Sequence, residues 1–227
     1  KNENIRTDEL YFVPEQVTDS SVVMRLPMNG GGHLDFRYVL HADSYMLDFT
    51  MEASGMEQAF APSVKTVDIH WHQRARQLEK GFSFENRYTS LSYKVKGEGS
   101  DYLSETKEET TEVGEPMDWI AFKNQFFSCV FIAGQDFNNT TLKSVPQAEG
   151  SGYLKNYDAT TTTFFDPTGK QPTRMQFYFG PNHFKTLQAT NDLAVDGKDL
   201  EMEDLVYLGW PLFRWINRWF TINLFDW

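Results

Sequence analysis

Apolar and polar residues alternate along most of the first 180 positions of this chain, which is the pattern of strands that bury one face. Every second residue is apolar from Leu34 to Leu40 and again from Tyr45 to Met51. The intervening residues, His41–Ser44, include an aspartate and a serine, which favour turns. The pattern therefore predicts a β-hairpin over residues 34–51.

The same alternation, or a short apolar run, predicts further strands in this region. They lie at Val22–Leu26, Val67–Trp71, Thr89–Val95, Trp119–Lys123, Phe126–Ala133, Tyr153–Phe165 and Met175–Phe179. Turns are predicted at Asn29–Gly32, Gly97–Gly99, Gly134–Asp136 and Asp166–Gly169, and a solvated loop is predicted at Glu105–Glu115. Many strands at short spacing, without helices between them, are typical of an antiparallel β-sandwich, so the predicted fold class is mainly β.

The pattern changes after Gly180. Residues Pro181–Gln188 predict a short helix entered through the proline, and Asn191–Asp204 is a polar, acidic connection with possible helical turns. We therefore expect residues 1–180 to form the β-sandwich and residues 181–227 to form a C-terminal helical segment.

The last seventeen residues, Pro211–Trp227, have helical periodicity. Their polar residues fall at i, i+3, i+4 and i+7 from Arg214, so one wide arc of the helix is apolar and a narrow arc is cationic. Periodicity alone favours a helix packed on its own domain. Tryptophan and phenylalanine opposite two arginines instead favour the headgroup boundary of a membrane. The expected membrane-interface residues are Trp210, Phe213, Arg214, Trp215, Arg218, Trp219 and Phe220.

Charge supports this distinction between the tail and the body. The chain has a formal net charge of −11, and residues 211–227 contain two arginines and one aspartate, which leaves −12 on residues 1–210. An acidic body argues against a nucleic-acid partner. It would also be repelled by anionic lipid, so membrane docking would depend on the tail.

The remaining composition sets further limits. No run approaches the roughly 20 apolar residues of a transmembrane helix. The single cysteine, Cys129, lies in an apolar run and is expected to be buried. The chain begins at Lys1 without an initiator methionine or a signal-type segment, so we expect a piece cut from a longer protein.

The search for chemistry finds no catalytic motif, and no cofactor is predicted. His70 and His72 flank Trp71 and share one face of a strand, which could hold a metal, but a polar outer face explains the pair more simply. Gly30–Gly32 lacks the strand-to-helix context of a phosphate loop. Carboxylate pairs such as Asp48 and Glu52 are present, but nothing raises one pair above the others as acid and base.

Three segments in the second half of the chain resemble segments of one protein family, and they occur in the same order as in that family. Trp119–Phe127 resembles the segment of bacterial YidC membrane-protein insertases in which a Trp-led strand runs into paired aromatics. Phe177–Pro181 is similar to that family's strand ending in Gly-Pro before a short helix. Asp204–Phe213 is similar to the stretch that leads to its second transmembrane helix.

The resemblance implies a large periplasmic domain, lying between the first and second transmembrane helices of a gram-negative inner-membrane insertase. It implies a galactose mutarotase-like β-supersandwich followed by C-terminal α-helices. It also implies a non-enzymatic role, with nascent membrane proteins and Sec components (SecDF and SecYEG) as partners of the full-length protein. Two departures stand: the family's opening strands have no match at Lys1, and the family's substrate groove lies in transmembrane helices absent from this sequence.

Two alternatives remain open from the sequence. The mutarotase-like fold allows a carbohydrate-binding or mutarotase-like protein, for which His33, His41 and His183 are available. The domain could also hold unfolded chains in a groove of the sandwich, which large exposed aromatic patches would favour.

Overall fold

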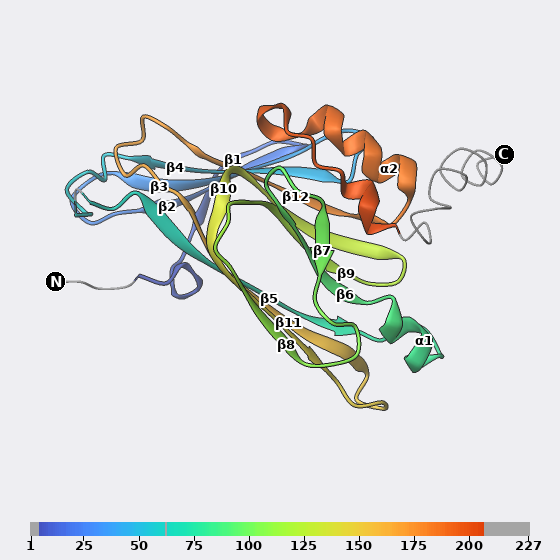
Figure 1. The fold of residues 1–227 in the computed structure, drawn as a ribbon. Helices are drawn as coiled ribbons and strands as arrows, with labels where there is room; N and C mark the ends of the chain where they lie inside the picture. Colours follow the sequence, from blue (N-terminus) through green and yellow to red (C-terminus); the bar gives the residue numbers. More distant parts are fainter. Residues whose placement is uncertain (1–4, 62, 207–227) are drawn as a thin grey trace.

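The computed structural model describes residues 5–61 and 63–206, and in this part the chain forms two packed β-layers with short helices at their margins (Figure 1). The strands are β1 (Val13–Val17), β2 (Ser21–Pro27), β3 (His33–Leu40), β4 (Met46–Ser54), β5 (Thr66–Arg76), β6 (Ser90–Val95), β7 (Ser100–Tyr102), β8 (Glu109–Val113), β9 (Met117–Lys123), β10 (Phe127–Pro146), β11 (Tyr153–Phe164) and β12 (Thr173–Pro181). The helices are α1 (Phe82–Arg87), α2 (Phe184–Gln188) and the 3₁₀ helices η1 (Thr7–Glu9), η2 (Ala189–Leu193), η3 (Val195–Gly197) and η4 (Met202–Leu205).

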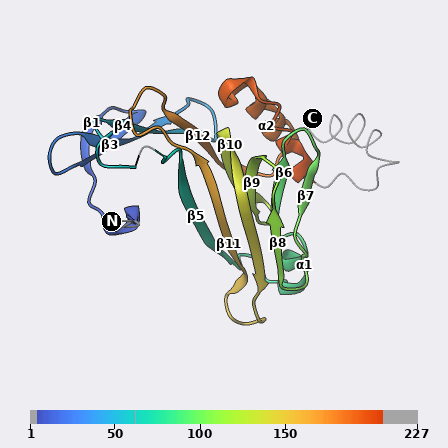
Figure 2. The same cartoon turned by 60° about the vertical axis from the view of Figure 1, so that its left-hand side comes forward.

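All the strand pairings are antiparallel, which confirms the predicted fold class. The larger sheet has the order β1-β2-β3-β4-β12-β10-β9-β6-β7. The smaller sheet has β11 between β5 and β10, with β8 on the other side of β10. The two layers diverge from β10, which belongs to both of them (Figure 2).

Alternation decides what lies between the layers. Phe131 and Phe177 on the larger sheet and Tyr157 and Ala159 on the smaller sheet belong to one hydrophobic cluster, against which Trp71 packs. We call this side of the larger sheet its inner face. The predicted hairpin is confirmed, because β3 and β4 pair from His33↔Ser54 to Leu40↔Leu47.

The turn predicted at Gly134–Asp136 is wrong, because β10 continues through it. The register on β9 shifts between Ile132 and Phe137, and Asp136 has a φ of 36°. The strand bends there and passes from the larger sheet into the smaller one, as β-bulges allow. Thr163 Oγ1 donates hydrogen bonds to the carbonyl oxygens of residues 135 and 136, at 3.2 and 3.1 Å, so the bend leaves neither acceptor unpaired.

Three other expectations need correction. Residues 109–113 of the predicted acidic loop form β8, whose charged side chains suit a strand at the edge of a sheet. Pro181 ends β12 instead of opening a helix, and α2 begins at Phe184 after Asn182, whose side-chain amide bonds the carbonyl of Asn124 at 2.7 Å. Cys129 is partly exposed instead of buried, because its strand position lies near the open end of the inner face.

The bend in β10 predicts a strong requirement for glycine at position 134. A Cβ there would lie 2.4 Å from the carbonyl oxygen of Arg174 on the neighbouring strand, so Gly134→Ala must displace backbone. We expect a loss of about 1–3 kcal/mol in the free energy of unfolding, measured by urea denaturation. Gly99→Ala is the matched control, because nothing lies within 4 Å of a Cβ at that position. Equal unfolding midpoints for the two variants would contradict the tight approach.

Candidate functional site

The residues predicted to meet a membrane, from Trp210 to Phe220, lie outside the described residues, which end at Val206. The segment before them, residues 184–206, is described and contains α2 and the 3₁₀ helices η2, η3 and η4. We call it the anchoring segment. It covers the outer face of the larger sheet, the side turned away from the smaller sheet (Figure 1). Its attachment fixes where the chain leaves the sandwich.

The apolar part of this attachment comes from alternation in β9, β10 and β12. The residues that point away from the inner face, Trp119, Val130 and Tyr178 among them, form a cluster with Leu187 and Leu200 of the anchoring segment. The Trp119 indole is fully buried, and its Nε1–H donates a hydrogen bond of 2.8 Å to the carbonyl oxygen of Leu200. The central strands are therefore buried on both faces.

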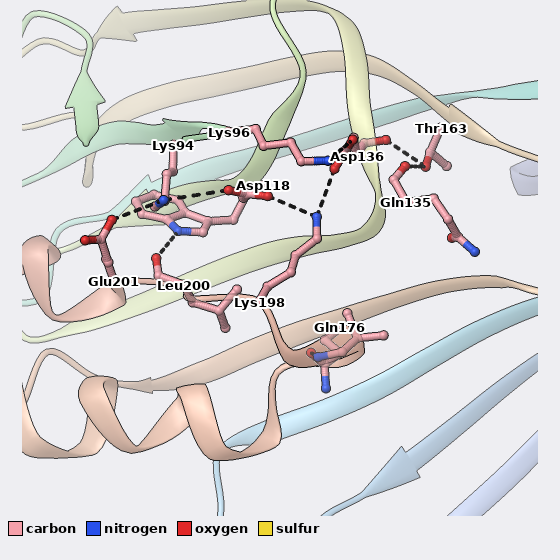
Figure 3. Close-up of polar contacts among 12 residues, drawn as sticks. Lys94, Lys96, Asp118, Gln135, Asp136, Thr163, Gln176, Lys198, Leu200 and Glu201 are labelled. Carbon is pink, nitrogen blue, oxygen red and sulfur yellow. Dashed lines mark hydrogen bonds and ion pairs between the residues drawn. The ribbon is translucent and has the colours of Figure 1, made fainter. Parts of the chain in front are cut away.

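The polar part is a chain of six charged side chains with alternating sign, which we call the lysine–carboxylate chain (Figure 3). Its ion pairs join Glu201 to Lys94 at 3.1 Å, Lys94 to Asp118 at 3.7 Å, Asp118 to Lys198 at 3.0 Å, Lys198 to Asp136 at 3.0 Å and Asp136 to Lys96 at 2.7 Å. Lys94 lies on β6, Lys96 directly follows β6 and Asp118 lies on β9. Asp136 comes from the bend in β10, and Lys198 and Glu201 come from the anchoring segment. The lysine–carboxylate chain therefore connects both sheets to the anchoring segment.

Burial determines what these charges do. The side chains of Lys94 and Asp118 are 5% and 7% exposed, and a charge so far from water is costly unless it is paired. At the exposed end, desolvation opposes ionisation of Asp136, but hydrogen bonds from Lys96 and Lys198 prevail and lower the pKa of that carboxyl. The same pair raises the pKa of Lys96. Three positive and three negative groups cancel, so this cluster fixes structure and offers no excess charge to a ligand.

A hollow of about 530 Å³ lies beside this cluster and is lined by Lys94, Lys96, Lys198 and Glu201, among others. Sequence reasoning missed these residues, because the alternation of β6 directs Ser92 and Lys94 away from the inner face and so predicts exposure. Both are buried, because the anchoring segment, about a hundred residues later in the chain, covers that face.

A second attachment lies on β12. The amide of Gln176 donates to Asp48 Oδ1 at 2.7 Å and to the Leu193 carbonyl at 2.8 Å, and its oxygen accepts from the backbone N–H of Val195 at 2.8 Å. A buried amide with all these bonds made is a rigid link. It fixes the middle of the anchoring segment to the larger sheet.

The structure separates two of the histidines proposed for a sugar site. His33 begins β3 and His41 follows its end, so the two lie at opposite ends of that strand. His41 Nε2 lies 2.9 Å from Asp48 Oδ2, and His183 Nδ1 lies 2.9 Å from Thr186 Oγ1.

His70 and His72 are exposed on β5, in agreement with the predicted polar outer face. His70 Nε2 lies 2.7 Å from Asp158 Oδ2 on β11. Across residues 5–61 and 63–206, no three metal-binding side chains converge on one site. None of the helices in the same ranges combines the length and apolar content that a bilayer crossing needs.

One more buried cation is Lys155 on β11. Its ammonium donates hydrogen bonds to the carbonyls of Asn86 and Thr89, at the end of α1. Burial lowers the pKa of Lys155 to about 8, with Glu105 opposing the shift. This residue attaches α1 to the smaller sheet.

Comparison with known families identifies the chain. A model of the YidC periplasmic domain matches residues 6–222. The chain belongs to the YidC periplasmic domain family. The resemblance drawn from the three segments is confirmed, and the domain lies on the periplasmic side of the inner membrane of a gram-negative bacterium.

Relatives of this YidC domain are named membrane protein insertase YidC. The protein from Phocaeicola vulgatus is 66% identical over all of this chain, which spans 37% of that relative's length. Those from Bacteroides fragilis and Parabacteroides distasonis are 55% and 41% identical over 98% and 99% of this chain, which spans 36% of each of them. The chain thus covers little more than a third of the length of these insertases.

Solved structures with a similar arrangement of strands are far more distant. A galactose mutarotase related enzyme from Lactobacillus acidophilus has a TM-score of 0.40 at 10% identity, over 74% of this chain and 70% of its own. A protein described as an aldose 1-epimerase from Escherichia coli K12 has a TM-score of 0.39 at 8% identity, over 75% of this chain and 68% of its own. At this similarity neither enzyme's activity extends to the YidC domain.

The central position of Asp118 in the lysine–carboxylate chain predicts a large effect of its neutralisation. Asp118→Asn leaves Lys94 and Lys198, whose side chains are 5% and 14% exposed, without their shared negative partner. We expect a loss of about 3–5 kcal/mol in the free energy of unfolding, measured by urea denaturation. Glu108→Gln neutralises a carboxylate that pairs with Lys143 at 3.0 Å but is 58% exposed, and should cost less than about 1 kcal/mol. Similar losses of unfolding free energy in both variants would show that burial does not determine how much an ion pair of this domain matters for stability.

The lowered pKa of Lys155 predicts a pH-dependent stability. Between the folded-state pKa of about 8 and the ordinary lysine pKa of 10.5, the unfolded chain binds a proton that the folded chain lacks, so the stability contributed by this group rises with pH. The difference in unfolding free energy between the parent and Lys155→Met should therefore grow in the parent's favour from pH 8 to pH 10, by about 1–3 kcal/mol. A constant difference over this range would contradict the shift.

Proposed function

We propose that this chain is a non-catalytic accessory domain of a membrane protein insertase. In the full-length protein it supports the insertion and folding of nascent inner-membrane proteins and contacts Sec components. The family match supports this role, because the relatives are named insertases. The separation of His33 from His41 further favours a non-catalytic role over the mutarotase-like alternative.

In this proposal, residues 1–180 form the sandwich and residues 181–227 lead from it toward a transmembrane helix of the longer protein. The tail rests at the periplasmic membrane surface through Trp210, Phe213, Arg214, Trp215, Arg218, Trp219 and Phe220. The observation that carries it is a juxtaposition along the chain. A segment held to the sheet by buried charges and Trp119 is followed at once by a sequence with an aromatic face and two arginines. Because the anchoring segment is held to the larger sheet, membrane contact of the tail would also fix the position of the domain.

Flotation with liposomes tests the tail. The double variant Trp215→Ser with Trp219→Ser removes two indoles from the apolar arc of the predicted helix, so the fraction of protein that floats should fall several-fold. The blue shift of tryptophan fluorescence on addition of liposomes should shrink as well.

Asn217→Ser with Thr221→Ser is the matched control, because it changes two residues on the polar arc of the same helix. This control should float like the parent. If the tryptophan variant, or a chain lacking residues 211–227, floats as well as the parent, the tail has no interface role.

A further inference from the structure

Large apolar side chains gather at one end of the sandwich, where β3 and β12 end and β4 and β10 begin. Leu40, Tyr45, Phe126, Phe127 and Phe179 are each between 49% and 58% exposed. We call these five residues the aromatic rim. Single exposed apolar residues need no explanation, but a group of them on adjacent strands marks a contact surface.

Backbone contacts place the rim residues at the ends of adjacent strands. The N–H of Phe179 donates to the Tyr45 carbonyl at 3.0 Å, and Phe127 pairs with Pro181 two residues further along β12. The N–H of Asn182 donates to the Phe126 carbonyl at 2.7 Å. The ring of Phe179 stacks on Phe177 with centroids 5.5 Å apart, so the rim continues into the hydrophobic interior of the sandwich.

Helix α1 extends this surface. Phe84 is 58% exposed, and its ring centroid lies 5.0 Å from that of Tyr88. Tyr88 lines a hollow of about 320 Å³ together with Lys123, the last residue of β9, which a short turn joins to Phe127. Figures 1 and 2 both place α1 beside the ends of β6 and β9.

The described chain also ends here. Leu205 lines the same hollow as Lys123, Tyr88 and Tyr102, so the anchoring segment delivers the chain to the end of the sandwich that carries the rim. The next residues hold the tryptophans and arginines of the tail. Exit point and rim therefore share one end of the domain.

The rim is also poor in charge, although the chain has 32 acidic residues. The segments that present it, residues 40–45, 124–127 and 179–182, contain a single carboxylate, Asp43, and no lysine or arginine. A surface with a single carboxylate among the segments that present it can approach lipid headgroups at a smaller cost in desolvation and repulsion than the rest of this acidic chain.

We propose that the aromatic rim is a second membrane contact, which rests on the interfacial zone of a phospholipid bilayer beside the tail. This inference builds on the proposed membrane contact of the tail and adds an orientation, with the ends of β3 and β12 facing the lipid. Aromatic side chains at headgroup depth bury their rings while polar backbone stays hydrated. Two contacts on one end hold the domain against tilting, which one helix does not.

Site-directed spin labelling of residues 1–227 tests this orientation. In a Cys129→Ser background, a label is placed at Phe126→Cys in the rim, and a matched control label at Asn29→Cys in the exposed turn between β2 and β3. Vesicles contain phosphatidylethanolamine and phosphatidylglycerol in a ratio of about seven to three. On vesicles, the label at position 126 should become more accessible to oxygen and less accessible to a water-soluble nickel chelate, and the label at position 29 should not change.

A rim variant gives an independent measurement. Phe127→Ser with Phe179→Ser should weaken vesicle binding roughly tenfold, as expected for two partly buried rings, while Tyr11→Ser, which removes an even more exposed ring before β1, should not. Urea denaturation of each variant shows whether the fold is retained.

The outcomes separate the two proposals. If the parent floats but the label at position 126 stays accessible to the nickel chelate, the tail binds lipid and the rim proposal is wrong. If the parent does not float, both proposals are wrong. Immobilisation of the rim label by a reduced, unfolded polypeptide but not by vesicles would assign the rim to substrate chains instead, and dipolar coupling between labels would assign it to a second copy of the domain.

Discussion

Asp118 is the group on which the C-terminal half of the structure depends. It lies on a strand buried on both faces and is the only negative partner between Lys94 and Lys198 in the lysine–carboxylate chain. Because Lys198 also pairs with Asp136, one carboxylate couples the anchoring segment to β6, to β9 and, through its partner, to the bend in β10. Buried ion pairs of this kind contribute little net stability but penalise every arrangement that separates them. They therefore fix the course of residues 184–206 more than they strengthen the fold.

That constraint depends in turn on the bend in β10. Asp136 reaches Lys96 and Lys198 because the strand turns out of the larger sheet at Gly134, where a neighbouring carbonyl leaves no space for a side chain. Thr163 on β11 holds the bend from the other layer. Gly134, Asp136 and Thr163 thus join the two sheets and position one end of the lysine–carboxylate chain.

The sequence predicts those parts of this arrangement that are local. The alternation in residues 34–51 determines a hairpin because each strand buries its apolar face against one neighbour. The sequence predicts a turn at Gly134 because a glycine permits a turn and a close strand contact equally, and only the carbonyl of Arg174 distinguishes them. Lys94 follows the alternation correctly but is covered by a segment about a hundred residues later, which no local pattern encodes. The aromatic rim was not predicted for the same reason, since Phe127 and Phe179 read as ordinary inward-facing strand residues.

The rim and the anchoring segment together explain how an acidic domain can lie against a membrane. The body carries a net charge of −12, so its average surface is repelled by anionic lipid. The segments that present Leu40, Phe127 and Phe179 contain one carboxylate, Asp43. The chain leaves the sandwich at that same end, beside a hollow that Asp101, Glu105 and Asp204 also line. The repulsion of the remaining surface then favours one orientation, since any tilt brings carboxylates toward the headgroups. The apolar rim and the negative charge of the remaining surface favour the same orientation of the domain on the membrane. The buried ion pairs hold the point where the chain leaves the sandwich at the end that carries the rim.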